Sequence, residues 1–282
     1  MALVGEQELV RSYLFVPADR PERVPKALAA GADAVIVDLE DAVAPGLKGA
    51  ARGALANALS AQRPVFVRVN AAGTPWFEED LAICAGPGVA GIVLPKAERI
   101  DELEYVCAHV RSDIAVLALI ETAKGFAGAK AIAECPCVRR LVFGSIDFQV
   151  DLGIEGDGDE LLYFRSQLVL VSRLAGLAAP VDGVTVKFDD VAATHADAMR
   201  ARREGFGGKL CIHPKQVGLV NDAFTPGADE MAWARKVVEA AASARGALAL
   251  DGKMIDKPVL AKAERILRVA QRLTIGRSGD KS

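Results

Sequence analysis

The sequence predicts an α/β protein that folds as a (β/α)₈ TIM barrel with extra C-terminal helices. Eight short apolar runs recur along the chain, separated by stretches with apolar residues at three- and four-residue spacing. The runs are continuously apolar, as expected for parallel strands that are covered on both faces. Polar residues follow nearly every run, as at the active-site end of such a barrel.

The strands can be assigned in chain order. The expected strands are Tyr13–Val16, Ala34–Asp38, Val65–Val69, Gly91–Leu94, Ala115–Ile120, Leu141–Gly144, Gly183–Val186 and Lys209–Ile212. Helical spacing lies between them, for example at Leu103, Val106 and Val110 and over residues 161–177.

An open doubly wound sheet is the main alternative fold. In its nucleotide-binding form a glycine-rich loop follows the first strand and cradles a pyrophosphate. Residues 17–21 of this chain contain no glycine. The barrel is therefore the favoured fold.

The chain continues beyond what a minimal barrel needs. We expect the barrel to occupy residues 1–226, with a helix from Pro214 to Phe224 after the last strand. A helical extension is expected over residues 227–275, with one helix within Asp229–Leu250 and a last helix from Lys257 to about Thr274. We expect this extension to pack on a neighbouring subunit and residues 276–282 to be frayed.

Composition and charge exclude several classes of partner. The net charge of −3, with mixed charges along the chain, offers no field suited to nucleic acid or to an anionic membrane. No apolar run approaches the length of a membrane span, and we see no secretory signal. The five cysteines do not show the paired spacings of a zinc site. Cys135 and Cys137 could form a redox or metal pair, but they lack partners in the sequence, so we expect small buried thiols in a reduced cytoplasmic protein.

Two carboxylates end neighbouring strands and suggest a metal site. Glu121 follows the fifth expected strand and Asp147 follows the sixth. Carboxylates without histidine or thiolate partners suit a hard cation such as Mg²⁺. The alternative is that both acids cap the helices that follow them.

A basic and an acidic group share the same expected rim. Arg68 ends the third strand, where a guanidinium can hold a carboxylate or an enolate oxygen by two parallel bonds. It can equally pair with the acidic cluster after the second strand, and the two roles are compatible. We place four residues behind the metal ligands, where they orient them: Asp38, Glu40, Asp41 and Lys96. His213 is either a general base or a partner of a loop carbonyl.

Several motifs in order carry a family resemblance. They are Arg11–Pro17, Arg20–Arg23, Asp38–Val43, Val67–Asn70, Ile120–Ala123, Phe143–Asp147, Gly207–Pro214 and Gly252–Asp256. With them the chain resembles the citrate lyase β-subunit-like branch of the HpcH/HpaI aldolase and citrate lyase superfamily, and it is similar to malyl- and citramalyl-coenzyme A lyases.

The resemblance implies a role for individual residues. Glu121 and Asp147 would bind Mg²⁺, with Mn²⁺ as an alternative, and Arg68 would contact the acyl part of the substrate. Positions that touch coenzyme A in related lyases correspond to Phe15, Arg20 and Lys26. Asp256 matches an acid that relatives insert into a neighbour's active site, which implies a homotrimer or a hexamer.

Two departures from the family pattern bear on the substrate. Ala18 and Asp19 stand where relatives often have glycine and then asparagine or serine, so a carboxylate is added near the expected coenzyme site. Lys187 stands at the expected end of the seventh strand, where a neutral or acidic residue would be usual. A lysine there would offer a new contact to an anion.

The resemblance implies a carbon–carbon lyase. It would cleave a malyl-, citramalyl- or citryl-type β-hydroxyacyl thioester into a 2-oxo acid and an acyl-coenzyme A through a metal-stabilised enolate. The alternatives are a metal-dependent aldolase acting on free pyruvate-type 2-oxo acids, a carrier-dependent citrate lyase β-type subunit, and a malyl-coenzyme A thioesterase or synthase.

Overall fold

The computed structural model describes residues 10–243, 248–250 and 253–279. The chain divides into two compact units, Met1–Asp222 and Ala223–Ser282, and each is described by itself. The boundary lies slightly before the expected one, at residue 226. None of the described helices is both long and apolar enough to cross a membrane.

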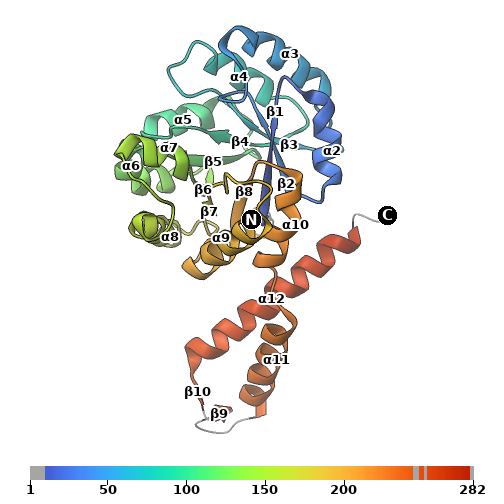
Figure 1. The fold of residues 1–282 in the computed structure, drawn as a ribbon, viewed down its shortest axis with the longest axis vertical. Helices are drawn as coiled ribbons and strands as arrows, with labels where there is room; N and C mark the ends of the chain where they lie inside the picture. The colour runs from blue at the N-terminus through green and yellow to red at the C-terminus, as the bar shows by residue number, and fades with distance from the viewer. Residues whose placement is uncertain (1–9, 244–247, 251–252, 280–282) are drawn as a thin grey trace. The chain divides into compact units, whose positions relative to one another are not determined.

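The first unit is a closed eight-stranded barrel in the order β1 to β8, with every neighbouring pair parallel and β1 pairing with β8 (Figure 1). The strands are β1 (Ser12–Pro17), β2 (Ala34–Asp38), β3 (Val65–Arg68), β4 (Val89–Leu94), β5 (Ala115–Ile120), β6 (Val138–Phe143), β7 (Val181–Asp182) and β8 (Gly208–Cys211). The predicted fold class is confirmed.

The barrel interior is filled by side chains. Because alternate residues of a strand point to opposite faces, every second apolar residue enters the barrel. Tyr13, Phe66 and Leu117 belong to this interior cluster, and the rings of Tyr13 and Phe66 meet edge to face at 5.6 Å. The interior is a packed core, so ligands must bind at its end.

Helices surround the strands (Figure 1). They are α2 (Val24–Ala29), α3 (Lys48–Ala58), α4 (Phe77–Cys84), α5 (Ile100–His109), α6 (Ala123–Glu134), α7 (Ser145–Leu152), α8 (Leu162–Leu174), α9 (Val191–Glu204) and α10 (Pro214–Phe224). Thr122 caps α6 by accepting a hydrogen bond from the Gly125 N–H.

The seventh strand differs from the expectation. Residues 183–186 were expected to form it, but β7 comprises only Val181 and Asp182. A buried charge network holds this short strand: Arg165 of α8 lies 3.0 Å from Asp182, and Lys209 of β8 lies 3.2 Å from it. The charged Asp182 interrupts the apolar run by which a strand is recognised in a sequence. The apolar residues that follow it were therefore predicted as the strand.

The second unit packs two helices around a small core. Helix α11 (Ala228–Ser243) contacts α12 (Lys257–Gly279), and β9 (Leu248–Leu250) pairs antiparallel with β10 (Lys253–Ile255). Its core is Ala234, Val237, Ala263 and Ile266. Helix α11 ends at Ser243, before the expected limit at residue 250. The last helix continues beyond Thr274 to Gly279, so residues 276–279 are assigned to it; residues 280–282 lie outside the described residues.

The cysteine prediction was wrong for one group. Cys107 and Cys137 form a disulfide, and the buried thiol of Cys135 lies beside it. The pairing was not predicted because the two residues are 30 positions apart and only the packing of α5 against α6 brings them together. Cys84 and Cys211 are buried thiols as expected, and burial raises the pKa of both.

Candidate functional site

A pocket of about 510 Å³ lies where the carboxyl ends of the barrel strands meet. Its lining residues are Phe15, Pro17, Asp38, Asp41, Ala42, Arg68, Leu119, Glu121, Phe143, Gly144, Ser145, Ile146, Asp147, Gly183, Val184, Val186, Leu210 and Ile212. They come from segments far apart in the sequence, as expected for the active-site end of such a barrel. Arg68, Glu121 and Asp147, which the sequence singled out, are all among them.

Glu121 is a buried carboxylate at the end of β5. Its Oε1 accepts a hydrogen bond of 2.8 Å from the backbone N–H of Lys96. Burial raises the pKa of Glu121 to about 8, and the neighbouring carboxylates of Glu40 and Asp147 add to this rise. The group is therefore costly to ionise until a positive charge arrives.

Asp147 approaches the same pocket from the next strand. The register pairs Ile120 of β5 with Phe143 of β6, so the residues that follow both strands lie on one rim. Asp147 is exposed in the first turn of α7 and lines the pocket beside Glu121. The structure thus brings the two carboxylates together.

Arg68 is held by three carboxylates. Its Nε and Nη2 donate to the two oxygens of Asp38 at 2.7 and 2.6 Å, forming a bidentate pair. Nη1 lies 3.0 Å from Glu40 and 3.7 Å from Asp41. The guanidinium also stacks on the ring of Phe15 at 4.9 Å. Arg68 is therefore fixed in orientation at the pocket wall.

Lys96 has a strained backbone conformation and contacts both Glu121 and Glu40. Its φ of +46° lies in the left-handed region, which is uncommon for a residue with a side chain. In this conformation the N–H of Lys96 donates to Glu121, and its Nζ donates to Glu40 Oε1 at 2.9 Å. Burial lowers the pKa of Lys96, but its pairing with Glu40 raises it overall, so the ammonium stays charged.

The charges of the site favour a divalent cation. Five carboxylates gather here, whereas three cations act on them: Arg68 and Lys96 form ion pairs, and the Lys48 ammonium lies close enough to interact with Asp38, Glu40 and Asp41. The acids are Asp38, Glu40, Asp41, Glu121 and Asp147. Among the described residues that line the pocket there is no histidine and no cysteine. An oxygen donor set with unbalanced negative charge fits a hard ion such as Mg²⁺ and does not fit a soft one.

Comparison with known proteins agrees with this geometry. The sequence profile of the HpcH/HpaI aldolase/citrate lyase family matches residues 11–214, which span all eight strands. The chain belongs to this family. It is 41% identical over 277 residues to a citrate lyase subunit β-like protein of Deinococcus radiodurans, an alignment that covers 92% of this chain and 96% of the relative.

Two further relatives add a named activity and a set of bound ligands. A (3S)-malyl-CoA thioesterase of Cereibacter sphaeroides is 35% identical, with 91% of this chain and 95% of the relative covered. The crystal structure of CitE from Mycobacterium tuberculosis with magnesium, acetoacetate and coenzyme A superposes with a TM-score of 0.83 at 38% identity, covering 93% of this chain and 98% of that one. The chain is thus an enzyme of the aldolase and citrate lyase type.

The residues expected to touch a coenzyme are only partly in the pocket. Phe15 lines it beneath Arg68. Arg20 and Lys26 are exposed and lie outside the lining, on the segment that follows β1. That segment leaves the barrel at the same rim, because β1 ends at Pro17. Asp19 is exposed there too, so its carboxylate shares this surface with Arg20.

Three other expected positions are not among the residues that line the pocket. Asp256 belongs to the second unit, where its Oδ1 accepts a hydrogen bond from the Val259 N–H and caps α12. His213 accepts a hydrogen bond from the Lys215 N–H through Nδ1 and stacks on a phenylalanine, and it is not among the lining residues. Lys187 does not end a strand, because β7 stops at Asp182; it is exposed in the following loop.

Two glycines and a serine of the site were missed by the sequence reasoning. A Cβ at Gly144 would lie 2.5 Å from the Cβ of Glu121, and a Cβ at Gly183 would overlap the hydroxyl of Ser145. Both positions must be glycine to let these side chains fit. The buried Ser145 hydroxyl lines the pocket and has no hydrogen-bond partner within the described part of the chain. The motif Phe143–Asp147 contains two of the three and was the available signal.

Proposed function

We propose that the protein is a Mg²⁺-dependent lyase that cleaves a β-hydroxyacyl-coenzyme A of the malyl, citramalyl or citryl type into a 2-oxo acid and an acyl-coenzyme A. The observation that carries the proposal is the convergence of buried Glu121, Asp147 and the fixed guanidinium of Arg68 on one pocket. Support also comes from the magnesium and coenzyme A bound to the CitE relative.

Glu121 and Asp147 would hold the metal. Their carboxylate oxygens are the donors that Mg²⁺ prefers, and the excess negative charge around them favours a divalent ion. When bound, Mg²⁺ would supply positive charge to the substrate oxygen on which negative charge develops.

Arg68 would position the substrate. Asp38 and Phe15 hold the guanidinium on two sides, so little conformational freedom remains to be lost on binding. Its positive charge at the pocket wall would attract the substrate carboxylate and stabilise developing charge on an oxygen. Glu40 and Asp41 moderate this charge and keep the arginine from moving into the pocket.

The coenzyme would approach over the segment after β1. Arg20 and Lys26 are exposed cations on this segment and suit phosphate groups, and Phe15 lies at the inner end. Asp19 opposes such an anion, and we expect Asp19→Asn to lower the KM for the thioester. If Arg20 and Lys26 bind phosphate, replacing both with Gln will raise the KM with little change in kcat.

Asp256 would act as the proton donor to the acyl carbon from a neighbouring subunit in a trimer or a hexamer. Because Asp256 also caps α12, Asp256→Asn is the informative variant: asparagine keeps the cap and removes the acid. Mixing the Asp256→Asn and Asp147→Asn proteins after mild dissociation would restore part of the activity, since one interface would then combine an intact barrel with an intact acid. No recovery in verified mixed oligomers would contradict the trans role, and light scattering would measure the subunit number.

The decisive experiment follows two products separately. The purified protein is incubated with Mg²⁺ and malyl-, citramalyl- and citryl-coenzyme A, and the release of 2-oxo acid and of free coenzyme A thiol are both measured. A lyase releases the 2-oxo acid and no thiol, and chelator or Asp147→Asn abolishes the release. A thiol background from the protein's own cysteines is subtracted with a substrate-free sample.

A thioesterase is the second candidate, favoured by the 35% identity to the (3S)-malyl-CoA thioesterase. It would release free thiol and a hydroxy acid without 2-oxo acid. Turnover of free hydroxy-oxo acids alone would indicate the pyruvate-type aldolase, and activity only on carrier-bound thioesters would indicate a citrate lyase β-type subunit.

A further inference from the structure

Three cysteines meet at a second place in the barrel. Cys107 lies near the end of α5, Cys135 follows α6, and Cys137 directly precedes β6. The Sγ of Cys135 lies 3.7 Å from the Sγ of Cys107 and 3.7 Å from that of Cys137. Cys107 and Cys137 are joined as a disulfide, and all three sulfurs lie within 4.8 Å of one another.

This cluster is separate from the pocket of Glu121 and Asp147. It lies at the start of β6, whereas Asp147 lies beyond the end of the same strand. Six residues of strand at ~3.3 Å each place the two sites roughly 20 Å apart. The cysteine cluster is therefore not needed for the proposed lyase chemistry.

We propose that the reduced cluster is a binding site for a soft divalent cation such as Zn²⁺, and that the Cys107–Cys137 disulfide is its metal-free, oxidised form. Zinc–thiolate bonds of about 2.3 Å in a tetrahedral set place the sulfurs about 3.8 Å apart. Both distances from the Cys135 sulfur match this spacing. The Cys135 thiol is equally far from both disulfide sulfurs. This position suits a third metal ligand better than a nucleophile that attacks one sulfur of the disulfide in line.

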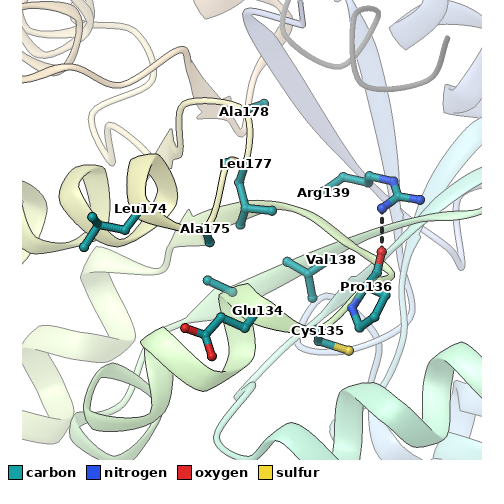
Figure 2. A pocket seen from close by; sticks show the side chains of 11 residues that line it. Glu134, Cys135, Pro136, Val138, Arg139, Leu174, Ala175, Leu177 and Ala178 are labelled. Carbon is teal, nitrogen blue, oxygen red and sulfur yellow. Dashed lines mark hydrogen bonds between the residues drawn. The ribbon is translucent and has the colours of Figure 1, made fainter. Parts of the chain in front are cut away.

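The turn that carries two of the ligands is held in place. Pro136 restricts the backbone between Cys135 and Cys137. The Nη1 of Arg139 donates a hydrogen bond of 2.6 Å to the carbonyl of Pro136, as Figure 2 shows for the pocket beside Cys135. These contacts fix the Cys-Pro-Cys turn before any ion binds.

The surroundings also suit a cation. The nearby carboxylate of Glu104 would favour a cation at this point. Cys107 and Cys137 are only half-buried, so an ion has access and a fourth position remains for water.

Opening the site requires a reductant. A dithiol gives two electrons and two protons to the disulfide, becoming a disulfide itself and leaving two protein thiols. Binding of the cation then displaces thiol protons. The site is consequently open only in the reduced protein, and metal uptake reports its redox state.

Co²⁺ is the probe of choice, since thiolate ligation gives it intense sulfur-to-metal charge-transfer absorption that carboxylate ligation does not. The whole protein is reduced with a phosphine, freed of reductant without oxygen, and titrated. We expect this absorption to saturate at one Co²⁺ per chain, to be displaced by Zn²⁺ and to be absent from the unreduced protein. Asp147→Asn and the matched buried-cysteine control Cys84→Ser must retain it, and Cys135→Ser must lose it.

Absence of the charge-transfer band from the reduced protein, or its persistence in Cys135→Ser, would overturn the proposal. So would a disulfide that opens and closes reversibly, by thiol counting, without any uptake of Co²⁺. Circular dichroism checks the fold of each variant. If Cys135→Ser is misfolded, the half-buried Cys107→Ser replaces it with the same expected loss.

Discussion

The backbone N–H of Lys96, a residue in the left-handed conformation, donates a hydrogen bond of 2.8 Å to the side-chain Oε1 of Glu121. The same residue extends its ammonium to Glu40, 2.9 Å away. One strained residue after β4 thus sets the position of a carboxylate after β5. Strain of this kind persists only where surrounding contacts enforce it, and here it serves the candidate metal site.

Loss of either proposed ligand should weaken metal binding. For Glu121→Gln and Asp147→Asn we expect Mg²⁺ affinity, measured by calorimetry, to fall by at least about tenfold, because a neutral amide is a poorer ligand for a hard cation. Glu134→Gln is the matched control, since Glu134 is exposed beside the other pocket at the opposite end of β6. Unchanged affinity in Asp147→Asn would contradict the assignment.

Metal stabilisation should grow with pH. The pKa of Glu121 is about 8 in the folded, metal-free chain, against an ordinary value of 4.5. Between these values the folded state binds more protons than the unfolded state, so the stability that this group contributes falls as pH rises. Mg²⁺ displaces the proton from Glu121, so this loss of stability at high pH does not occur in the metal-bound protein. The increase in Tm on adding Mg²⁺ should therefore be larger at pH 8 than at pH 6, and Glu121→Gln should abolish the difference.

A methyl group at position 144 should disturb Glu121. In Gly144→Ala the new Cβ would lie 2.6 Å from Glu121 Oε2, so the carboxylate must move. We expect turnover to fall by about 10²-fold, as for other displacements near 1 Å. Gly49→Ala, which meets no atom within 4 Å, should retain activity and change the free energy of unfolding by less than about 1 kcal/mol. Equal turnover in both variants would refute the packing argument.

Replacing Arg68 with lysine should not be conservative. Lysine cannot form the paired bonds to Asp38 or the stack on Phe15. We expect kcat/KM to fall by about 10²-fold because the cation loses its fixed position. Arg52→Lys provides the comparison: Arg52 also pairs with two acids, Glu79 and Asp80, but lies outside the pocket lining, so only stability should respond.

The buried charges of β7 should matter for folding. Burial alone would raise the pKa of Asp182, but Lys209 and Arg165 lower it overall. Asp182→Asn would remove the carboxylate that pairs with Lys209 and would leave Arg165 with Asp157 and Glu204, and it should cost about 3 kcal/mol in the free energy of unfolding. Because the pKa is lowered in the folded state, the wild-type contribution is present above the ordinary value of 3.8 and disappears as pH falls below it. Urea denaturation of both proteins, with the surface variant Asp113→Asn as control, would measure this.

The barrel and the rim of the site were predictable because both follow from local patterns. Apolar runs of β-branched residues mark strands, and parallel strands in a closed barrel bring their carboxyl ends to one rim. Residues that follow different strands, such as Arg68, Glu121 and Asp147, therefore had to lie near one another. The pairing of Arg68 with the acids after β2 followed from the neighbouring positions of β2 and β3.

The sequence by itself determined the fold class, the order of the strands and the rim on which Arg68, Glu121 and Asp147 meet. Only the tertiary structure decided that Lys96 is left-handed, that residue 144 must be glycine, that β7 stops at Asp182 and that Cys107 meets Cys137. The first set depends on periodicity along one segment. The second depends on distances between segments remote in sequence, which close packing sets to within a few tenths of an ångström and no local pattern records.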